Sequence, residues 1–358
     1  MTQKAVIFFA NSSSPHVRHW IQMIDGRLKV TVIDIYRSSS LVSGNDSVAC
    51  RYPLPFWARK LPKVLQYVLL GLWAWIYLPD ENQTHVHNAS GFGLVGLISR
   101  HKYALVIYGS ELFSMPQKSI AYRQILKTVI RRAHTIYTSA ESTKLEVAKI
   151  AGSNQRMVSF SHGIARKFTI DTHARTRNNR IWICNRRIHE LYNTIYLVEA
   201  FKQYCQKHQG KGKLVLIEGD GDPKYINEVR KLASEVPSID IVPGFLGAGR
   251  LSTLLDEASF CISIPNSDQL STSILEAAGR GCISVLHDLP SYASVKDISI
   301  LLPSESVSVE GLTNMFLETS RLSHEQVATL SQKSMALIDA NFSIEQAFGN
   351  YMKSLDRK

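Results

Sequence analysis

Residues 262–292, ISIPNSDQLSTSILEAAGRGCISVLHDLPSY, decide the fold of this chain. An apolar run over residues 260–264 leads into a polar loop that carries Asp268. Small hydroxyl residues then open an apolar helix that carries Glu276, and a second apolar run covers residues 282–286. A strand, a helix and a strand in this order are typical of parallel strands joined by a crossover helix. The stretch therefore predicts an α/β fold with a parallel sheet.

The helix in this stretch also carries the groups that a nucleotide needs. Ser271, Thr272 and Ser273 stand at its N-terminus, where unpaired amides and a partial positive charge suit phosphate. Glu276, one turn further on, can accept hydrogen bonds from a ribose diol. Asp268, eight residues earlier, can reach a sugar attached to the phosphate. In this strand–loop–helix setting, the two carboxylates predict a binding site for a nucleotide that carries a sugar.

Similar β-like runs recur along the chain, most of them separated by helical segments. They cover residues 5–10, 29–35, 84–88, 104–108, 135–139, 157–164, 180–185, 213–219 and 239–244. Residues 38–55 are expected to form a loop. Strands separated by helices predict parallel sheets with helices on both faces, so we expect two successive doubly wound domains.

The domain boundaries follow from one polar segment. Residues 166–180 are basic, lack apolar periodicity and are expected to link the domains. We therefore place an N-terminal domain at residues 1–168 and a C-terminal domain at residues 169–340. A last helix at residues 341–358 is expected to begin at Ser343, where a glutamine three residues later completes a capping box, and to cross back to the N-terminal domain.

The charge of the chain is unevenly distributed. The formal net charge is +11, and residues 1–170 hold 21 Lys and Arg against 8 Asp and Glu. Residues 171–358 hold 20 against 22. A basic first half suggests that this half meets an anionic partner, either nucleic acid or an anionic membrane surface. Since no nucleic-acid-binding motif accompanies the charge, we expect no nucleic-acid partner.

The cysteines and apolar runs indicate the compartment. The five cysteines are scattered without a Cys-x-x-Cys pair, which predicts reduced, buried thiols and a cytoplasmic protein. The N-terminal sequence lacks a secretory apolar region of normal length. No apolar run reaches the roughly 18 residues of a transmembrane helix, so we expect none.

One segment of the basic half, residues 51–77, combines positive charge with aromatic residues and apolar residues at helical spacing. Its basic and tryptophan side chains include Arg51, Arg59, Lys60, Lys63, Trp73 and Trp75. A basic, aromatic, amphipathic helix suits a membrane interface. The alternative is a buried domain helix with a basic entry.

The acidic pair in its strand–loop–helix setting resembles that of family 4 of the retaining glycosyltransferases, with Asp268 in place of the usual first Glu. The resemblance covers nearly the whole chain and is strongest over residues 180–292. It implies the GT-B fold, in which two Rossmann-like doubly wound domains face each other across a cleft. It also implies a UDP- or GDP-sugar donor and no metal cofactor.

The acceptor implied is a lipid-linked or other saccharide in surface polysaccharide or lipopolysaccharide assembly. The expected location is peripheral, on the inner face of the cell membrane. Two alternatives stay open. One is a nucleotide-sugar epimerase or hydrolase on the same fold, since fold does not fix chemistry. The other is a non-catalytic, membrane-associated partner of a transferase.

The resemblance assigns roles in the C-terminal domain. Arg187, at the end of a strand, falls on the family arginine that neutralises the donor diphosphate, with Arg186 as a stand-in. Tyr192 occupies the position of a family lysine. Gly219 and Gly221 match a turn that lets the backbone approach the nucleotide.

Two further features lie on the loops of this domain. Phe245 and Leu246 match a loop that packs on the nucleotide base. Asp220 and Asp222 form an Asp-x-Asp pair, whose alternative reading is a manganese site, as in a different glycosyltransferase fold.

Roles in the N-terminal domain follow in the same way. Ser13 and His16 lie where the family has a glycine-rich loop ending in His, facing the transferred sugar and phosphate. Glu111 keeps an acidic position that orients an acceptor hydroxyl, while Tyr108 replaces the usual His of that turn. His87 is expected at a strand end lining the cleft floor, or else in a structural role.

Overall fold

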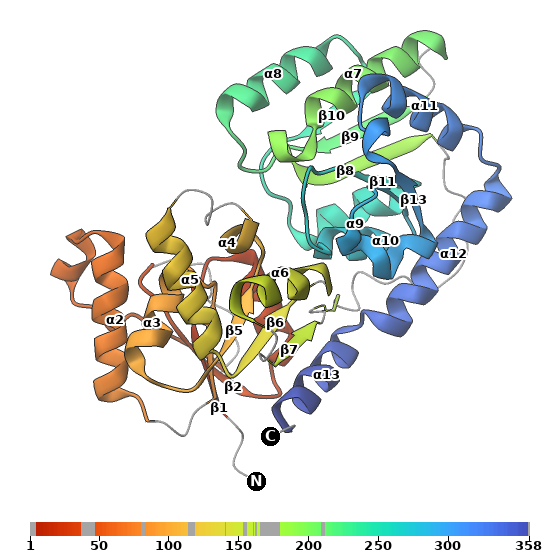
Figure 1. The fold of residues 1–358 in the computed structure, drawn as a ribbon. Coiled ribbons are helices and arrows are strands. Elements are labelled where there is room, and N and C mark those ends of the chain that lie inside the picture. Colours follow the sequence, from red (N-terminus) through yellow and green to blue (C-terminus); the bar gives the residue numbers. More distant parts are fainter. Residues whose placement is uncertain are drawn as a thin grey trace. The chain divides into compact units, whose positions relative to one another are not determined.

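The computed structural model describes residues 5–36, 47–79, 83–113, 119–139, 141–152, 156–159, 161, 163–164, 180–208 and 212–356. The chain divides into two compact units (Figure 1). Unit 1 comprises Met1–His162 and Ala347–Lys358, and unit 2 comprises Gly163–Gln346.

Unit 1 is built on a parallel sheet in the order β3-β2-β1-β4-β5-β6-β7. The strands are β1 (Ala5–Phe9), β2 (Lys29–Ile33), β3 (Val48–Arg51), β4 (Gln83–His87), β5 (Tyr103–Ile107), β6 (Thr135–Thr138) and β7 (Met157–Ser159). The helices are α1 (Pro15–Ile24), α2 (Lys63–Tyr77), α3 (Gly91–Ser99), α4 (Ser110–Phe113), α5 (Ile120–Arg132), α6 (Glu141–Ala151) and most of α13 (Ile344–Asp356). The strand order reverses between β1 and β4, which is where ligands bind in sheets of this kind.

Alternating apolar residues of the strands fill two cores, one on each face of the unit 1 sheet. In β1, Phe8 contributes to the core that contains Trp20 of α1, whereas Phe9 contributes to the core that contains Val95 of α3. Successive strand side chains point to opposite faces, so a run of apolar residues is buried on both.

Unit 2 repeats the plan with a parallel sheet in the order β10-β9-β8-β11-β12-β13. Its strands are β8 (Ile181–Arg187), β9 (Lys213–Ile217), β10 (Ile239–Val242), β11 (Phe260–Ser263), β12 (Ile283–His287) and β13 (Ser299–Leu302). Its helices are α7 (Thr194–Lys207), α8 (Pro223–Ser234), α9 (Ala248–Glu257), α10 (Thr272–Gly279), α11 (Val309–Ser320) and α12 (His324–Asn341). Here the order reverses between β8 and β11.

The predicted α/β class with two doubly wound sheets is confirmed, and the strand–helix–strand prediction for the opening stretch corresponds to β11, α10 and β12. The sequence analysis did not predict β3, α3, α4, β13, α11 and α12. Residues 38–55 were expected to be a loop, but β3 lies within them; it has only four residues, none of them fully buried, so its apolar run is short. Helix α3 was not expected because its sequence, GFGLVGLIS, contains three glycines. The expected linker, residues 166–180, lies outside the described residues except for its last one.

The last helix begins at Ile344, and the Ser343 hydroxyl accepts a hydrogen bond from the Gln346 amide at 3.2 Å. Its residue Tyr351 is buried in unit 1, where its hydroxyl lies 3.0 Å from Nε2 of His85. The cysteines carry no disulfide; Cys50 and Cys205 are only partly buried. Within the described ranges, no helix is both long and apolar enough to cross a membrane.

Candidate functional site

Arg186 lies at the carboxyl end of β8, beside the point where the strand order of unit 2 reverses. The register between β8 and β9 shifts between Cys184 and Arg187. The neighbouring guanidinium groups differ in environment: the side chain of Arg186 is 10% exposed, whereas that of Arg187 is 42% exposed. Arg186 is therefore the arginine that points into the protein.

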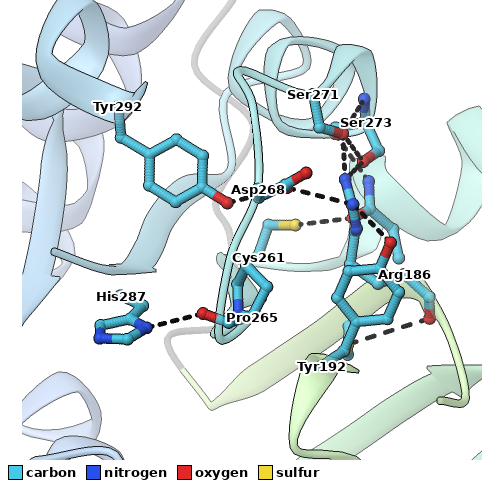
Figure 2. A network of polar contacts seen from close by, with 11 residues as sticks. Arg186, Tyr192, Cys261, Pro265, Asp268, Ser271, Ser273, His287 and Tyr292 are labelled. Atoms are coloured by element: carbon cyan, nitrogen blue, oxygen red, sulfur yellow. Dashed lines mark hydrogen bonds and ion pairs between the residues drawn. The ribbon is translucent and has the colours of Figure 1, made fainter. Parts of the chain in front are cut away.

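The Arg186 guanidinium is the centre of a polar network (Figure 2). Its Nη2 lies 3.1 Å from Oδ2 of Asp268 and donates to the Tyr192 hydroxyl at 2.7 Å. The guanidinium also lies over the Tyr192 ring, 4.4 Å from its centroid. Nη1 donates to the hydroxyls of Ser273, at 3.0 Å, and Ser271. The network joins β8 to the N-terminus of α10.

Asp268 is held from two sides. The same Oδ2 accepts a hydrogen bond from the Tyr292 hydroxyl at 2.9 Å. Burial raises the pKa of Asp268 above its ordinary value, and the charge of Arg186 partly offsets this. Burial alone would lower the pKa of Arg186, but Asp268 and the nearby tyrosines outweigh it, so that the pKa is raised. Arg186 therefore stays charged.

The loop between β11 and α10, which carries Asp268, is anchored by hydrogen bonds to its backbone. Nδ2 of Asn193 donates to the Ile264 carbonyl at 2.8 Å. On the other side, Nδ1 of His287 lies 2.7 Å from the Pro265 carbonyl, and Nε2 lies 3.0 Å from the Ser304 hydroxyl. These contacts fix the path of the loop before it reaches the acidic side chain.

Helix α10 presents the predicted nucleotide-binding residues on one face. Ser271 is its N-cap, and the hydroxyl accepts a hydrogen bond from the Ser273 amide at 3.1 Å. Of the eight helical residues, Thr272, Ser273 and Glu276 are half-buried and the remainder are buried. The hydroxyls and the carboxylate therefore share the accessible side of the helix. The sequence predicted that these hydroxyl residues open a helix that carries Glu276, as they do in α10, and their role in nucleotide binding stays a prediction.

Arg187 and the predicted glycine turn lie together at the surface. Nη1 of Arg187 lies 2.8 Å from Oδ1 of Asp220. A Cβ on Gly219 would lie 2.5 Å from the Cβ of Arg187, and one on Gly221 would lie 1.9 Å from the Ile188 carbonyl oxygen. The sequence explained these glycines by approach to a nucleotide, whereas the structure shows that they let the turn approach the end of β8.

The Asp-x-Asp pair has structural contacts. Oδ1 of Asp222 caps α8 by accepting from the amides of Lys224, at 2.9 Å, and Tyr225, at 3.2 Å. Within the described ranges, no three His, Cys, Asp or Glu side chains gather as a metal ion would require. Metal independence stays a prediction.

The predicted base-contacting loop follows β10, at the same edge of the sheet as the ends of β8 and β9. Gly244 has a φ of +68°, and Phe245 next to it is 73% exposed. Leu246 is half-buried. Because the Phe245 ring is exposed, a planar group such as a nucleotide base can stack on it.

In unit 1, the predicted residues lie at the carboxyl ends of β1, β4 and β5. The amide and hydroxyl of Ser13 donate to Oδ1 of Asn11, at 3.0 and 2.6 Å. The His16 ring is exposed and stacks on Tyr108, 4.5 Å between centroids. Nδ1 of His87 lies 2.7 Å from the Tyr108 hydroxyl. Tyr108 thus links the two histidines.

The carboxylates of Glu111 and Asp34 in unit 1 stabilise turns by accepting hydrogen bonds from backbone amides. Glu111, 1% exposed, accepts from the Tyr108 amide at 2.9 Å. Asp34, which is fully buried, accepts from the amides of Ser12, at 2.6 Å, and Tyr36, at 2.9 Å. Sequence reasoning missed Asp34; an acid at the end of an apolar strand was the available signal. It also missed Tyr292, whose hydroxyl has no sequence signature.

Helix α2 and the 3₁₀ turn before it expose apolar side chains, and we call this the α2 surface. Its exposed members are Phe56, Trp57, Val64, Leu65, Leu72, Trp75, Ile76 and Tyr77. Trp73 is half-buried and packs on the core. Lys63 lies over the Tyr36 ring at 4.2 Å, and Arg100, which the sequence did not single out, lies over Trp75 at 4.7 Å. The helix is buried on one side only, at Gln66, Leu70, Gly71 and Ala74.

Comparison with known proteins supports the fold assignment. The family model described as glycosyl transferase 4-like matches residues 5–140. The predicted resemblance to family 4 is thereby confirmed over most of unit 1. In this half of the chain the sequence motifs match the family less well than they do over residues 180–292. No curated protein matches the chain.

Solved structures match over almost the entire chain. HepE from Anabaena, in complex with UDP and glucose, has a TM-score of 0.77 and 12% identity, covering 99% of this chain and 100% of that one. Sucrose-phosphate synthase from Thermosynechococcus elongatus has a TM-score of 0.78 and 13% identity, covering 99% and 98%. A glycosyltransferase from Rickettsia africae has a TM-score of 0.74 and 12% identity, covering 100% of both chains. The chain has the GT-B fold that was predicted.

We expect Gly221→Ala to destabilise unit 2 by about 1–3 kcal/mol, because the added methyl group would meet the Ile188 carbonyl and the backbone must shift. The matched control is Gly249→Ala, where an added Cβ meets nothing within 4 Å. Urea unfolding of both variants tests this. Equal stabilities would show that the turn is not tightly packed on β8.

Proposed function

We propose that this protein is a retaining glycosyltransferase that moves a sugar from a UDP- or GDP-sugar to a lipid-linked saccharide acceptor in surface polysaccharide assembly. One observation supports the donor site above all. The accessible face of α10, with its capping serine, hydroxyls and Glu276, adjoins a buried guanidinium at the carboxyl edge of the sheet. HepE, which shares the fold, is known in complexes with UDP and with UDP-glucose, so UDP is the first nucleotide to test.

Each donor group has a chemical role in this proposal. Glu276 accepts hydrogen bonds from the ribose hydroxyls, and Asp268 lies beside the sugar. The α10 amides and the guanidinium that adjoins them at the end of β8 neutralise the diphosphate, whose negative charge grows as the glycosidic bond breaks. The exposed Phe245, with Leu246, packs on the base.

Retention of configuration is proposed to follow front-face attack. The departing phosphate oxygen accepts the proton of the acceptor hydroxyl, while that hydroxyl oxygen forms the new glycosidic bond on the same face. Oδ2 of Asp268 is already engaged by Arg186 and Tyr292, which disfavours this carboxylate as a covalent nucleophile. In unit 1, Ser13, His16 and the turn braced by Glu111 are proposed to serve the transferred sugar and the acceptor.

The α2 surface is proposed to dock unit 1 on the inner face of the cell membrane and to bring a lipid-borne acceptor to the enzyme. Its exposed side is apolar and aromatic, and Arg59 lies over the Phe56 ring at 5.3 Å, while Arg100 lies over Trp75. Aromatic side chains bordered by cations suit the headgroup region of an anionic bilayer.

Glu276→Gln is expected to weaken binding of the nucleotide sugar by roughly tenfold or more, because a charged acceptor on the ribose is lost. Calorimetry with UDP- and GDP-sugars chosen by a thermal-shift screen measures this. Glu228→Gln, an exposed carboxylate on α8, is the control and should bind as the wild type does. Unchanged affinity in Glu276→Gln would remove the main support for this donor site.

Transfer activity is expected to survive EDTA, since the positive charge at the donor comes from arginine and helix amides. Asp222→Ala should cost about 1 kcal/mol of stability through the lost cap of α8, without loss of turnover per folded molecule. Activity that disappears with EDTA and returns with manganese would restore the metal-site alternative.

Flotation with liposomes tests the membrane proposal. Wild-type protein should float with anionic but not neutral vesicles, and less at high salt, because each basic residue near the surface contributes roughly 1 kcal/mol that salt screens. Changing Arg51, Arg59, Lys60 and Lys63 together to Gln should abolish flotation but leave donor binding intact.

The control variant carries the same loss of charge on exposed lysines of unit 2, namely Lys207, Lys224, Lys231 and Lys333. It should float as the wild type does. If both quadruple variants float equally well, the α2 surface does not dock on lipid.

A further inference from the structure

We propose that Arg186, rather than Arg187, binds the donor diphosphate, and that Asp268 and Tyr192 are positioning residues that hold its guanidinium for this task. This inference rests on the proposed function and deepens it. It departs from the sequence alignment, which places the diphosphate-binding arginine at Arg187.

The two arginines differ in their partners. Arg187 is largely exposed and pairs with Asp220, whose side chain is 57% exposed. A surface ion pair of this kind contributes little and holds neither group firmly. The side chain of Arg186 is only 10% exposed, stays charged, and directs its Nη1 at the hydroxyls of the α10 N-terminus. The guanidinium that is already fixed beside the α10 amides needs no rearrangement to meet an anion there.

The contacts of Arg186 divide between its two terminal nitrogens (Figure 2). Nη2 is bound to the Asp268 carboxylate and the Tyr192 hydroxyl. Among the residues that the structure describes, the hydrogen-bond partners of Nη1 are the neutral hydroxyls of Ser271 and Ser273. Serine hydroxyls can turn and donate to phosphate, so an arriving diphosphate can replace them as the acceptor for Nη1. Nη2 meanwhile stays anchored.

Tyr192 occupies the position at which the family has a lysine, and its contacts with Arg186 show how the site can keep a positive charge. It brings no cation itself, but its ring supports the Arg186 guanidinium and its hydroxyl accepts from it. The positive charge absent from position 192 is thus supplied from position 186. The exchange keeps a cation at the site and makes it a planar donor that can bind phosphate oxygens in pairs.

Asp268 acts in the same arrangement from the other side. Its Oδ2 binds Arg186 and is fixed in turn by the Tyr292 hydroxyl. An isolated buried guanidinium would be costly, and the paired carboxylate removes that cost while fixing the direction of the group. The effect of Asp268 on a diphosphate should therefore pass through Arg186.

Calorimetry on the full chain with UMP and UDP tests the proposal, because the ratio of the two affinities isolates the second phosphate. GMP and GDP replace them if UDP does not bind. Arg186→Ala should lower UDP affinity by roughly 10- to 100-fold and UMP affinity much less. Arg187→Ala, the matched control, should lower UDP affinity less than about threefold. The double variant Arg186→Ala/Tyr192→Lys should regain part of the loss.

Double-mutant cycles test the positioning roles. Tyr192→Phe and Asp268→Asn should each change the ratio of UDP affinity to UMP affinity in the wild-type background. In the Arg186→Ala background they should leave this ratio unchanged. Additive effects would overturn the positioning roles. A loss confined to Arg187→Ala, or an equal loss of UMP and UDP in Arg186→Ala with a lower melting temperature, would overturn the role of Arg186. If the wild type binds neither UDP nor GDP, the proposed function itself fails, before any variant is compared.

Discussion

A guanidinium buried beside a carboxylate constrains the rest of unit 2. Removing two charges from water costs several kcal/mol per ion, and their attraction offsets this only when the remaining donors and acceptors are satisfied. Here Tyr192, Tyr292 and the two serines of the α10 N-terminus supply those partners. The network therefore holds together only if β8, the loop after β11 and the start of α10 keep their mutual positions. The anchoring of that loop by Asn193 and His287 is a consequence of the same requirement.

The strand order reverses once in each sheet, and the side chains at the carboxyl ends of the strands differ in chemistry between the two units. Where the strand order of unit 2 reverses, the strand ends carry a cation and hydroxyls. At the same edge of the unit 1 sheet, the buried carboxylate of Asp34, which follows β2, accepts hydrogen bonds from the amides of Ser12 and Tyr36, and the His16 ring stacks on Tyr108. Unit 2 thus offers positive charge suited to a diphosphate. Unit 1 offers aromatic rings and hydroxyls, which suit an uncharged sugar.

The sequence predicted most of the fold because apolar runs separated by helices leave few alternatives for a parallel sheet. It failed where the local signal was weak: β3 is a short edge strand, and the glycines of α3 resemble turn residues. For the site, it placed Ser271 and Ser273 at the start of a helix that carries Glu276, and this helix is α10. It could not tell which of two adjacent arginines points inward, because that depends on a register shift after Cys184. Nor could it find Tyr292, whose role arises from tertiary contact alone.

On the α2 surface, several apolar side chains are exposed while a polar side chain of the same helix is buried. On an ordinary surface helix the buried side is apolar and the exposed side polar. In α2 the buried side includes Gln66, whose amide donates to the Arg59 and Leu61 carbonyls at 3.1 and 2.7 Å, while Val64, Leu72 and Ile76 are exposed. Burying an amide is tolerated here because two carbonyls of the preceding turn accept from it, and this ties the basic turn to the helix. The turn that carries Arg59 and Lys60 is thereby held at one end of the apolar face. Charge and apolar area are therefore presented together on this side of unit 1.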